Sequence, residues 1–301
     1  MFEISQLRCF VAVAEELHFN RAAERLNMTQ PPLSRQIRLL EHHVGAPLLS
    51  RTSRKVRLTA AGRSFLPDAT RLLRLAQEAA ATARRVAQGE AGTLAIGFTA
   101  ATGYSLLPAL VGLVREHLPG VTLTMKEMVS SQQLEALATG QLDLGFVRPH
   151  VHHPELESIE LLREDLVLAI PEGDAADWPK HPTVADLHGK PFLQFSPFEG
   201  LYFHNLIARE LDDTGVIPNV VEYVPQFHTM LALVKAGVGV ALVPEAAAQL
   251  HFEHTVIRPF KTRRPKSVVT NCSFRYDNDN PSLRIYLEIL AKQFSNSSLP
   301  A

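Results

Sequence analysis

Cysteine is scarce in this chain of 301 residues, which contains only Cys9 and Cys272. Two cysteines provide neither a disulfide framework nor the four ligands of a structural metal site. Cys9 falls on the apolar face of the first predicted helix and fits a small core residue. Cys272 has no second thiol in the C-terminal two thirds of the chain, which argues against a thiol-pair switch.

Long apolar runs are also missing. No run reaches the roughly 18 residues that a membrane-spanning helix requires, and the N-terminus lacks the basic-then-apolar pattern of a secretory signal. We therefore expect a cytoplasmic protein that does not interact with a membrane.

Motifs of the common enzyme classes are absent too. There is no Gly-x-Ser-x-Gly elbow and no P-loop. Gly237-Val238-Gly239 follows a predicted helix and precedes a predicted strand, which is the reverse of a dinucleotide-binding turn. His150, His152 and His153 could ligate a metal, but they stand in a Pro-flanked loop without an evident carboxylate or thiol partner. We expect no enzymatic activity, no metal and no cofactor.

Charge is distributed unevenly along the chain. Residues 1–89 contain 14 Lys and Arg against 7 Asp and Glu, a net charge of +7. Residues 90–301 contain 16 against 24, a net charge of −8. A basic N-terminal part joined to an acidic remainder is typical of a DNA-binding head on a body that does not contact DNA.

Residues 29–41, Thr-Gln-Pro-Pro-Leu-Ser-Arg-Gln-Ile-Arg-Leu-Leu-Glu, have the pattern of a helix that could lie in a DNA groove. Thr29 suits the N-cap, and the two prolines after it fall where backbone N–H groups have no partner within the helix. Leu33, Ile37 and Leu40 recur at helical spacing and predict a buried face. The amide, hydroxyl and guanidinium groups off that face suit base edges and phosphates. Gly45 and Pro47 should end the helix.

The residues before this helix predict the rest of a helix-turn-helix. Ser5 to about Leu17 is an amphipathic helix, and 19–26 is a second helix with Asn20 as its cap. Asn27-Met28 supplies the tight turn between the two helices of the motif.

Two short strands, 48–51 and 55–58, should form a basic wing around Thr52-Ser53-Arg54. Arg51, Arg54, Lys55 and Arg57 suit phosphates, with Arg54 able to enter the minor groove; a solvated basic hairpin is the alternative. The candidate DNA-binding residues are Asn20, Arg21, Thr29, Gln30, Pro31, Pro32, Ser34, Arg35, Arg38, Arg51, Arg54 and Lys55.

A long helix follows, capped by Thr59 and running to about Ala87. Apolar residues spaced alternately by four and three form a heptad seam, which predicts that this helix pairs with another; the alternative is a buried helix of a monomer. Pro67 should kink it. A dimer would place two recognition helices on a two-fold DNA site. The seam residues are Phe65, Ala69, Leu72, Ala76, Ala79, Ala83 and Val86.

Strand and helix patterns alternate after a flexible joint at 88–92, which predicts α/β architecture with parallel sheets. The first set of strands is 93–98, 121–127 and 142–147, with helices at 104–117 and 132–138. A second set begins at 166–170 and continues with strands at 192–195, 220–223 and 240–243 and helices at 201–214 and 229–236. A strand at 268–274 and a helix at 282–295 complete the chain.

Small ligands in such folds bind at the carboxyl ends of the strands. The loops there carry hydroxyls, one guanidinium and aromatic rings, which together favour a small organic acid, with an aromatic one fitting the rings. Each residue also has a purely structural interpretation, as a helix cap, an aromatic ring of the core or a member of a surface ion pair. The candidate effector-binding residues are Thr99, Ala100, Ala101, Thr102, Ser130, Arg148, Ser196, Phe198, Tyr202, Phe203, Phe227 and His228.

The N-terminal part resembles the winged helix-turn-helix of LysR-type transcriptional regulators. The matching segments are 7–14, Ala22-Ala23-Glu24-Arg25-Leu26, 29–37, Leu40-Glu41 and Leu58-Thr59-Ala60-Ala61-Gly62. The resemblance implies a two-lobed effector domain similar to periplasmic binding proteins, with crossovers near 162–166 and 259–266. It also implies a homotetramer built as a dimer of dimers, a double-stranded operator, a small-molecule co-inducer and RNA polymerase as a further candidate partner.

Segments 97–108 and 142–148 resemble the branch of that family that responds to muconate, benzoate and chlorocatechol breakdown products. The resemblance places Ser130 and Arg148 where that branch holds the effector carboxylate. The hydroxyl which that branch uses after the first strand falls on Ala101 here, with Thr99 or Thr102 as substitutes, and this departure argues against muconate itself.

The expected domains are a winged helix-turn-helix over 1–58, a linker and dimerisation helix over 59–89 and an effector-binding domain over 90–301. Within the last, lobe I should comprise about 90–163 and 267–301, and lobe II about 164–266. The competing function is a solute-binding receptor of a transporter, which would share the two-lobed body. Such a receptor would need a signal peptide and would lack the basic head, so the first 89 residues argue against it.

Overall fold

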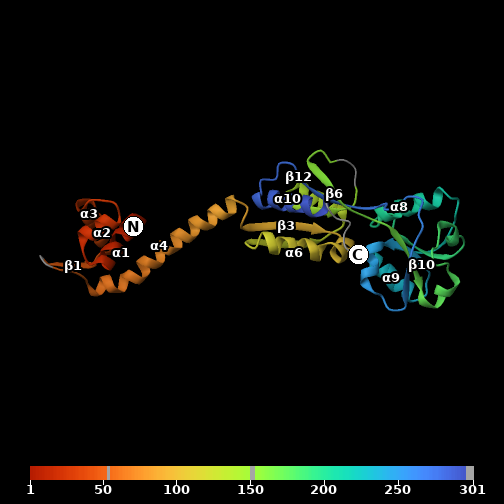
Figure 1. Cartoon of the computed structure of the whole chain (residues 1–301), viewed down its shortest axis with the longest axis horizontal. Helices are drawn as coiled ribbons and strands as arrows, with labels where there is room; N and C mark the ends of the chain where they lie inside the picture. Colours follow the sequence, from red (N-terminus) through yellow and green to blue (C-terminus); the bar gives the residue numbers. More distant parts are fainter. Residues whose placement is uncertain (53–54, 150–152, 296–301) are drawn as a thin grey trace. The chain divides into compact units, whose positions relative to one another are not determined.

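A computed structural model of the protein describes residues 1–52, 55–149 and 153–295. The chain divides into two compact units, Met1–Arg85 and Val86–Ala301 (Figure 1), and each is described by itself.

The first unit is a small helical domain with a β-hairpin. Its elements are α1 (Ile4–Glu16), α2 (Phe19–Arg25), α3 (Gln30–Val44), β1 (Leu49–Thr52), β2 (Lys55–Leu58) and the greater part of α4 (Ala60–Ala87). Leu33, Ile37 and Leu40 are fully buried against Leu7 and Phe10 of α1, which confirms the predicted apolar face. Strands β1 and β2 pair antiparallel, as expected of a wing.

Two predicted caps differ in the structure. The N-cap of α2 is His18, whose Nδ1 accepts a hydrogen bond from the backbone N–H of Arg21 at 3.4 Å, so the prediction of Asn20 as the cap is wrong. Thr29 occupies the N-cap position of α3 but makes no side-chain cap bond. The second and third helical residues, which normally donate to a cap, are Pro31 and Pro32, and proline has no N–H.

Helix α4 begins as predicted, because the Oγ1 of Thr59 accepts a hydrogen bond from the N–H of Gly62 at 2.9 Å. Only Gly62 and Ala69 are buried along its 28 residues. The later seam positions are open within one chain, with Leu72 39% and Val86 40% exposed.

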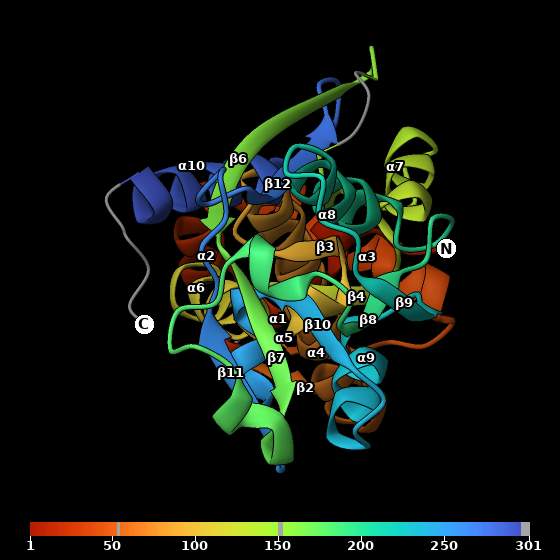
Figure 2. The same cartoon turned by 90° about the vertical axis from the view of Figure 1, so that its right-hand side faces the viewer.

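The second unit contains two five-stranded sheets, each the centre of a lobe. The first sheet has the order β4 (Val121–Glu127), β3 (Gly92–Phe98), β5 (Leu144–Val147), β12 (Val268–Arg275) and β6 (Leu156–Glu164). The second has the order β11 (Thr255–Pro259), β7 (Leu166–Pro171), β10 (Val240–Pro244), β8 (Pro191–Phe195) and β9 (Asn219–Val224). Figure 2 shows β7 and β10 side by side in the second sheet.

Both sheets are mixed, so the prediction of parallel sheets is confirmed for β3, β4 and β5 and for β8, β9 and β10 but is wrong for the remaining strands. In the first, β3 runs parallel to β4 and β5, but β12 runs antiparallel to β5 and β6. In the second, β7 runs antiparallel to β10 and β11. Strands β6 and β11 were not predicted. Most residues of both are exposed or half-buried, so neither has the continuous apolar run of a buried strand.

Helices cover the sheets on both lobes. They are α5 (Ala100–Ser105), α6 (Leu107–His117), α7 (Ser130–Ala138), α8 (Leu201–Asp212), α9 (Phe227–Lys235) and α10 (Pro281–Ser295), and α6 and α10 share a core with β3 and β5. The helix predicted over 104–117 is broken at Leu106 into α5 and α6. Pro108 has no N–H to donate back to Tyr104, so the helix cannot continue regularly through this point.

The chain passes between the two sheets twice. It leaves the first sheet at Glu164 and enters the second at Leu166, and it returns over residues 260–267. Residues of both lobes that come together near these crossovers form the site described next.

Candidate functional site

The polar residues of α3 lie on its solvent side. Gln30, Arg35 and Arg38 are exposed and Ser34 is half-buried, while the opposite face of the helix is buried in the core. Pro31 and Pro32 are exposed in the first turn. The Nε2 of Gln30 donates to the Oγ of Ser34 at 3.1 Å. This row of donors and acceptors is available to the edges of bases and to phosphates.

Two of the candidate DNA-binding residues, Asn20 and Arg21, lie on α2. Asn20 is exposed. Arg21 is also exposed, but its Nη2 donates to the backbone oxygen of Glu16 at 2.6 Å and its Nε lies 3.4 Å from the carboxylate of Glu16. This tie to α1 competes with a phosphate for the guanidinium, so Arg21 is the weaker of the two candidates.

The wing is described in part. Arg51 and Lys55 lie in β1 and β2, which the structure describes for the backbone, and Arg54 lies outside the described residues. Arg57 lies on β2, opposite Ser50 of β1. It is exposed and can reach a phosphate.

A cavity of about 900 Å³ lies in the second unit, with walls from both lobes. That volume is within the range of small-molecule sites. Nine predicted effector residues line it, namely Thr99, Ala100, Ala101, Ser130, Arg148, Phe198, Tyr202, Phe203 and Phe227. The loops after β3, β4, β5 and β8 therefore meet in one place, as expected of strand ends.

Three predicted residues are not part of the cavity wall. Thr102 is buried, with its Oγ1 3.0 Å from that of Thr99. Ser196 is also buried; its Oγ accepts from the N–H of Phe198 and donates to the carboxylate of Glu199, which lowers the pKa of Glu199. His228 is half-buried beside Phe227. The hydroxyls of Thr102 and Ser196 thus make hydrogen bonds within their own segments.

Arg148 is the most distinctive residue of the cavity. It follows β5, and only 5% of it is exposed. Its Nη1 donates to the backbone oxygen of Val269 at 3.0 Å and to the Oγ1 of Thr270 at 2.7 Å. Its guanidinium carbon lies 5.7 Å from the ring centre of Tyr202 and 5.0 Å from that of Phe203, both of lobe II. The interpretation of Arg148 as a surface ion pair is therefore wrong.

A buried carboxylate, Glu164, accompanies Arg148 at the first crossover. Its Oε2 lies 3.9 Å from Nη1 of Arg148, and its Oε1 accepts from the N–H of Ala246 at 3.0 Å. Burial lowers the pKa of Arg148 and raises that of Glu164, because both charged forms lose hydration, and their mutual attraction opposes both shifts.

The returning chain is held by side chains of the same cavity. The hydroxyl of Tyr202 accepts from the N–H of Val269 at 2.8 Å and donates to the oxygen of Ser267 at 3.2 Å. Val269 thus has its N–H bound by Tyr202 of lobe II and its carbonyl bound by Arg148 of lobe I. The Oγ of Ser130 accepts from the backbone N–H of Arg148 at 3.0 Å, which leaves its own hydroxyl hydrogen to donate.

Several lining residues were not predicted from the sequence, including Glu127, Glu199 and a second guanidinium, Arg209. Arg209 is seven residues after Tyr202 on α8, so the two share one helix face. That helical spacing could have identified Arg209 in the sequence, but Arg209 lies within a helix and the effector residues were predicted from strand-end loops.

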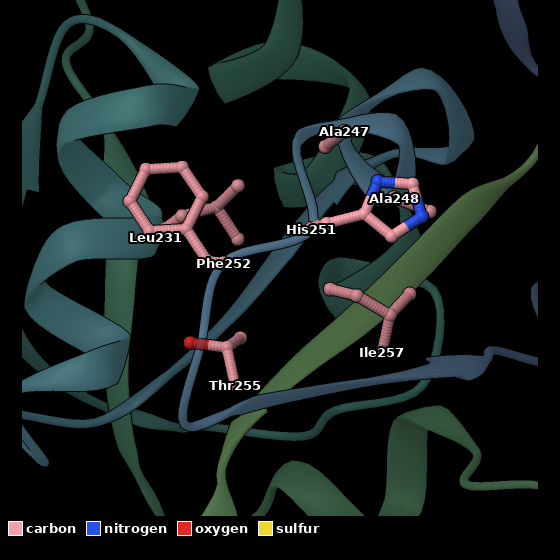
Figure 3. Close-up of a pocket in the computed structure, with 7 residues that line it drawn as sticks. All are labelled: Leu231, Ala247, Ala248, His251, Phe252, Thr255 and Ile257. Carbon is pink, nitrogen blue, oxygen red and sulfur yellow. The ribbon is translucent and has the colours of Figure 1, made fainter.

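A second, smaller pocket of about 400 Å³ lies on lobe II, between α9, β11 and the 3-10 helix η3 (Glu245–Leu250) (Figure 3). Its walls are Leu231, Ala247, Ala248, His251, Phe252, Thr255 and Ile257. None of the predicted effector residues is among them, and no Lys, Arg, Asp or Glu is. The predicted effector residues are therefore found on the larger cavity and not on this one.

Metal ligation finds no support among residues 1–52, 55–149 and 153–295, where no three His, Cys, Asp or Glu are grouped to hold an ion. His150 and His152, which raised that alternative, lie outside the described residues. In the same part of the chain, no helix has both the length and the apolar character to span a membrane.

Comparison with known proteins matches both units. A family described as "Bacterial regulatory helix-turn-helix protein, lysR family" matches residues 4–63, and one described as "LysR substrate binding domain" matches residues 87–295. The regulator AlsR of Bacillus subtilis (strain 168) is 35% identical over 287 residues, covering 95% of each chain. The Hca operon transcriptional activator HcaR of Escherichia coli (strain K12) is 34% identical over 294 residues, covering 98% of this chain and 99% of HcaR.

A solved structure shows the same arrangement of elements. Full-length CbnR complexed with its target DNA matches with a TM-score of 0.85 and 31% identity, over 97% of this chain and 99% of that one. The exposed polar face of α3, the hairpin beside it and the two-lobed α/β unit agree with these matches. The chain belongs to the LysR family and is a DNA-binding transcriptional regulator with a C-terminal effector-binding domain, not an enzyme.

Proposed function

We propose that a small organic acid, preferentially an aromatic one, binds the inter-lobe cavity and modulates operator binding or promoter activation. The observation that carries this proposal is Arg148, a guanidinium on the wall of the cavity with two aromatic rings beside it. A carboxylate would meet a charge-assisted hydrogen-bond donor there. The resemblance of segments 97–108 and 142–148 to the branch that responds to muconate, benzoate and chlorocatechol breakdown products supports this class of ligand.

The candidate acid contacts are Arg148 and Ser130, with Thr99 as the substitute for the hydroxyl missing at Ala101. Phe198, Tyr202, Phe203 and Phe227 would surround the apolar part of the ligand. Ala100 and Ala101 line the same wall and leave it room.

On the DNA side, we propose that Gln30, Pro31, Ser34 and Arg35 contact bases or adjacent phosphates and that the wing contacts the backbone. Two copies are required to read a two-fold site, so the open seam of α4 would pair in a dimer, with a dimer of dimers as the larger assembly. Contact with RNA polymerase and a cytoplasmic location belong to the same proposal.

We also propose the domain division 1–58, 59–89 and 90–301, with lobes at 90–163 plus 267–301 and 164–266. The two compact units and the two crossovers support it. A solute-binding receptor is not favoured, because the family match includes the N-terminal helix-turn-helix.

A thermal-shift screen tests the acid proposal. Benzoate and other aromatic or dicarboxylic acids are compared with matched neutral amides such as benzamide. At a hundredfold excess over its dissociation constant, a ligand adds about 2.7 kcal/mol of stability, which raises Tm by several degrees. We expect acids to protect, amides not to, and Arg148→Ala to abolish the protection.

Arg115→Ala, at an exposed arginine of α6, is the matched control and should keep the protection. Equal protection by acids and amides, or protection that survives Arg148→Ala, would contradict the assignment of the carboxylate site.

A further inference from the structure

One carboxylate connects the recognition helix to the wing. Glu41 lies near the end of α3 and is half-buried. Its Oε1 accepts hydrogen bonds from the backbone N–H of Leu48 at 2.9 Å and from that of Leu49 at 3.0 Å. Leu48 and Leu49 stand at the entrance to β1 and are buried, with 0% and 5% of each exposed. Their N–H groups therefore cannot turn to water if the carboxylate is removed.

The opposite side of the same hairpin base is held by the start of α4. The backbone N–H of Thr59 donates to the oxygen of Leu48 at 3.0 Å, and its hydroxyl donates to the oxygen of Pro47 at 2.7 Å. A Cβ on Gly62 would lie 2.0 Å from the oxygen of Leu48, so only glycine permits this approach. The wing base is thus fixed to α4 by backbone and hydroxyl groups and to α3 by the carboxylate of Glu41.

We propose that Glu41 is a positioning residue for DNA binding, which holds the wing at a set distance and angle from the recognition helix. A single oxygen that receives two N–H groups restrains the hairpin more firmly than one bond, and an ionised acceptor strengthens both. The residues of α3 and the exposed Arg57 of the wing can then engage one duplex together. In this role Glu41 acts through the wing and not by contacting the DNA itself. The inference rests on the DNA-binding function of the head and adds how its two contact elements are coupled.

A double-mutant cycle on the full chain tests the coupling. Binding to a 30-base-pair duplex is measured against salt concentration for Arg57→Ala, Glu41→Ala and the two combined. We expect each single variant to weaken binding and to lower the salt slope by about 1 for each phosphate that is no longer neutralised. The defining result is that Arg57→Ala has little further effect once Glu41 is replaced by alanine, because the wing is already displaced.

Arg35→Ala is the matched control, since α3 keeps its own place in the core. Its fold-change should be the same in the unmodified protein as in the Glu41→Ala background. Glu41→Gln retains an acceptor oxygen at the same reach, and the effect of Arg57→Ala should persist in that background. If Glu41→Ala acted only by lowering the stability of the protein, it would alter the effects of Arg35→Ala and Arg57→Ala to the same extent. A loss confined to the effect of Arg57→Ala therefore indicates a displaced wing.

The proposal is overturned if Arg57→Ala costs the same factor with and without Glu41, or if Glu41→Ala leaves affinity and salt slope unchanged. Should Glu41→Ala not fold, Glu41→Asp is carried through the same cycle. Its carboxylate is one methylene shorter and cannot reach both N–H groups, so the same Arg57 comparison decides. Binding of the unmodified protein to the duplex is measured alongside, so failure of the DNA-binding function would be seen separately.

Discussion

Arg35 and Arg148 carry the same guanidinium in opposite surroundings. Arg35 is exposed on α3, where nothing in the core requires it. Arg148 is buried; its charge is paired with Glu164, and its Nη1 donates to Thr270 and to the carbonyl of Val269. Replacing the first should change binding alone, whereas replacing the second also leaves a buried carboxylate without its counter-charge.

The first prediction therefore concerns Arg35. Arg35→Ala should reduce discrimination for the protein's own promoter by about 1–3 kcal/mol, roughly a 5- to 150-fold change in affinity relative to random duplex. Its melting temperature should stay near that of the unmodified protein. A gel-shift titration against both duplexes measures the ratio, and normal binding by the variant would remove Arg35 from the interface.

At the scale of elements, α3 begins at a good N-cap residue that makes no capping hydrogen bond. Thr29 stands at the cap position, but the prolines after it remove the N–H groups that its hydroxyl would accept. The first turn is instead pre-organised by the fixed φ of proline, and at its exposed end the side chain of Gln30 donates to that of Ser34. Such an end is suited to contacts from outside the chain.

Helix α4 differs, because the later part of its apolar seam, from Leu72 to Val86, is exposed in a single chain. Ala79→Glu would place a charge at a position of close approach and should raise the dissociation constant of the dimer at least about tenfold, a cost of roughly 1.4 kcal/mol. Sedimentation of the full chain over a range of concentrations measures it. Ala81→Glu, on the other side of the helix, is the control, and equal behaviour of the two variants would contradict pairing through the seam.

At the scale of the whole molecule, the net charge of −1 conceals a head that attracts DNA and a body that repels it. The prediction is that the intact protein binds random duplex with a strong salt dependence despite its overall charge. Affinity should fall at least about tenfold between roughly 50 and 200 mM salt, because even a few neutralised phosphates release counterions. A salt slope near zero in the same titration would show that the basic head does not carry the interaction.

Much of the architecture was predictable because it depends on local patterns. The buried face of Leu33, Ile37 and Leu40, the cap at Thr59 and most strands of the α/β unit follow from periodicity and capping chemistry. The antiparallel pairing of β6 and β12 could not be predicted from the sequence. The direction of a strand depends on which edge of the sheet is unpaired when the chain reaches it, and no local residue pattern specifies that edge.

The sequence by itself determined the two-part organisation, the recognition helix and the loops from which a ligand site could be built, since each depends on residues near one another in the chain. Only the tertiary structure decided that Arg148 is buried, that Tyr202 and Arg148 hold the same residue from two lobes, and that Glu41 bonds to the wing. These contacts join residues separated by turns or by whole strands, and their geometry is set by the packing of complete elements, which sequence spacing does not specify.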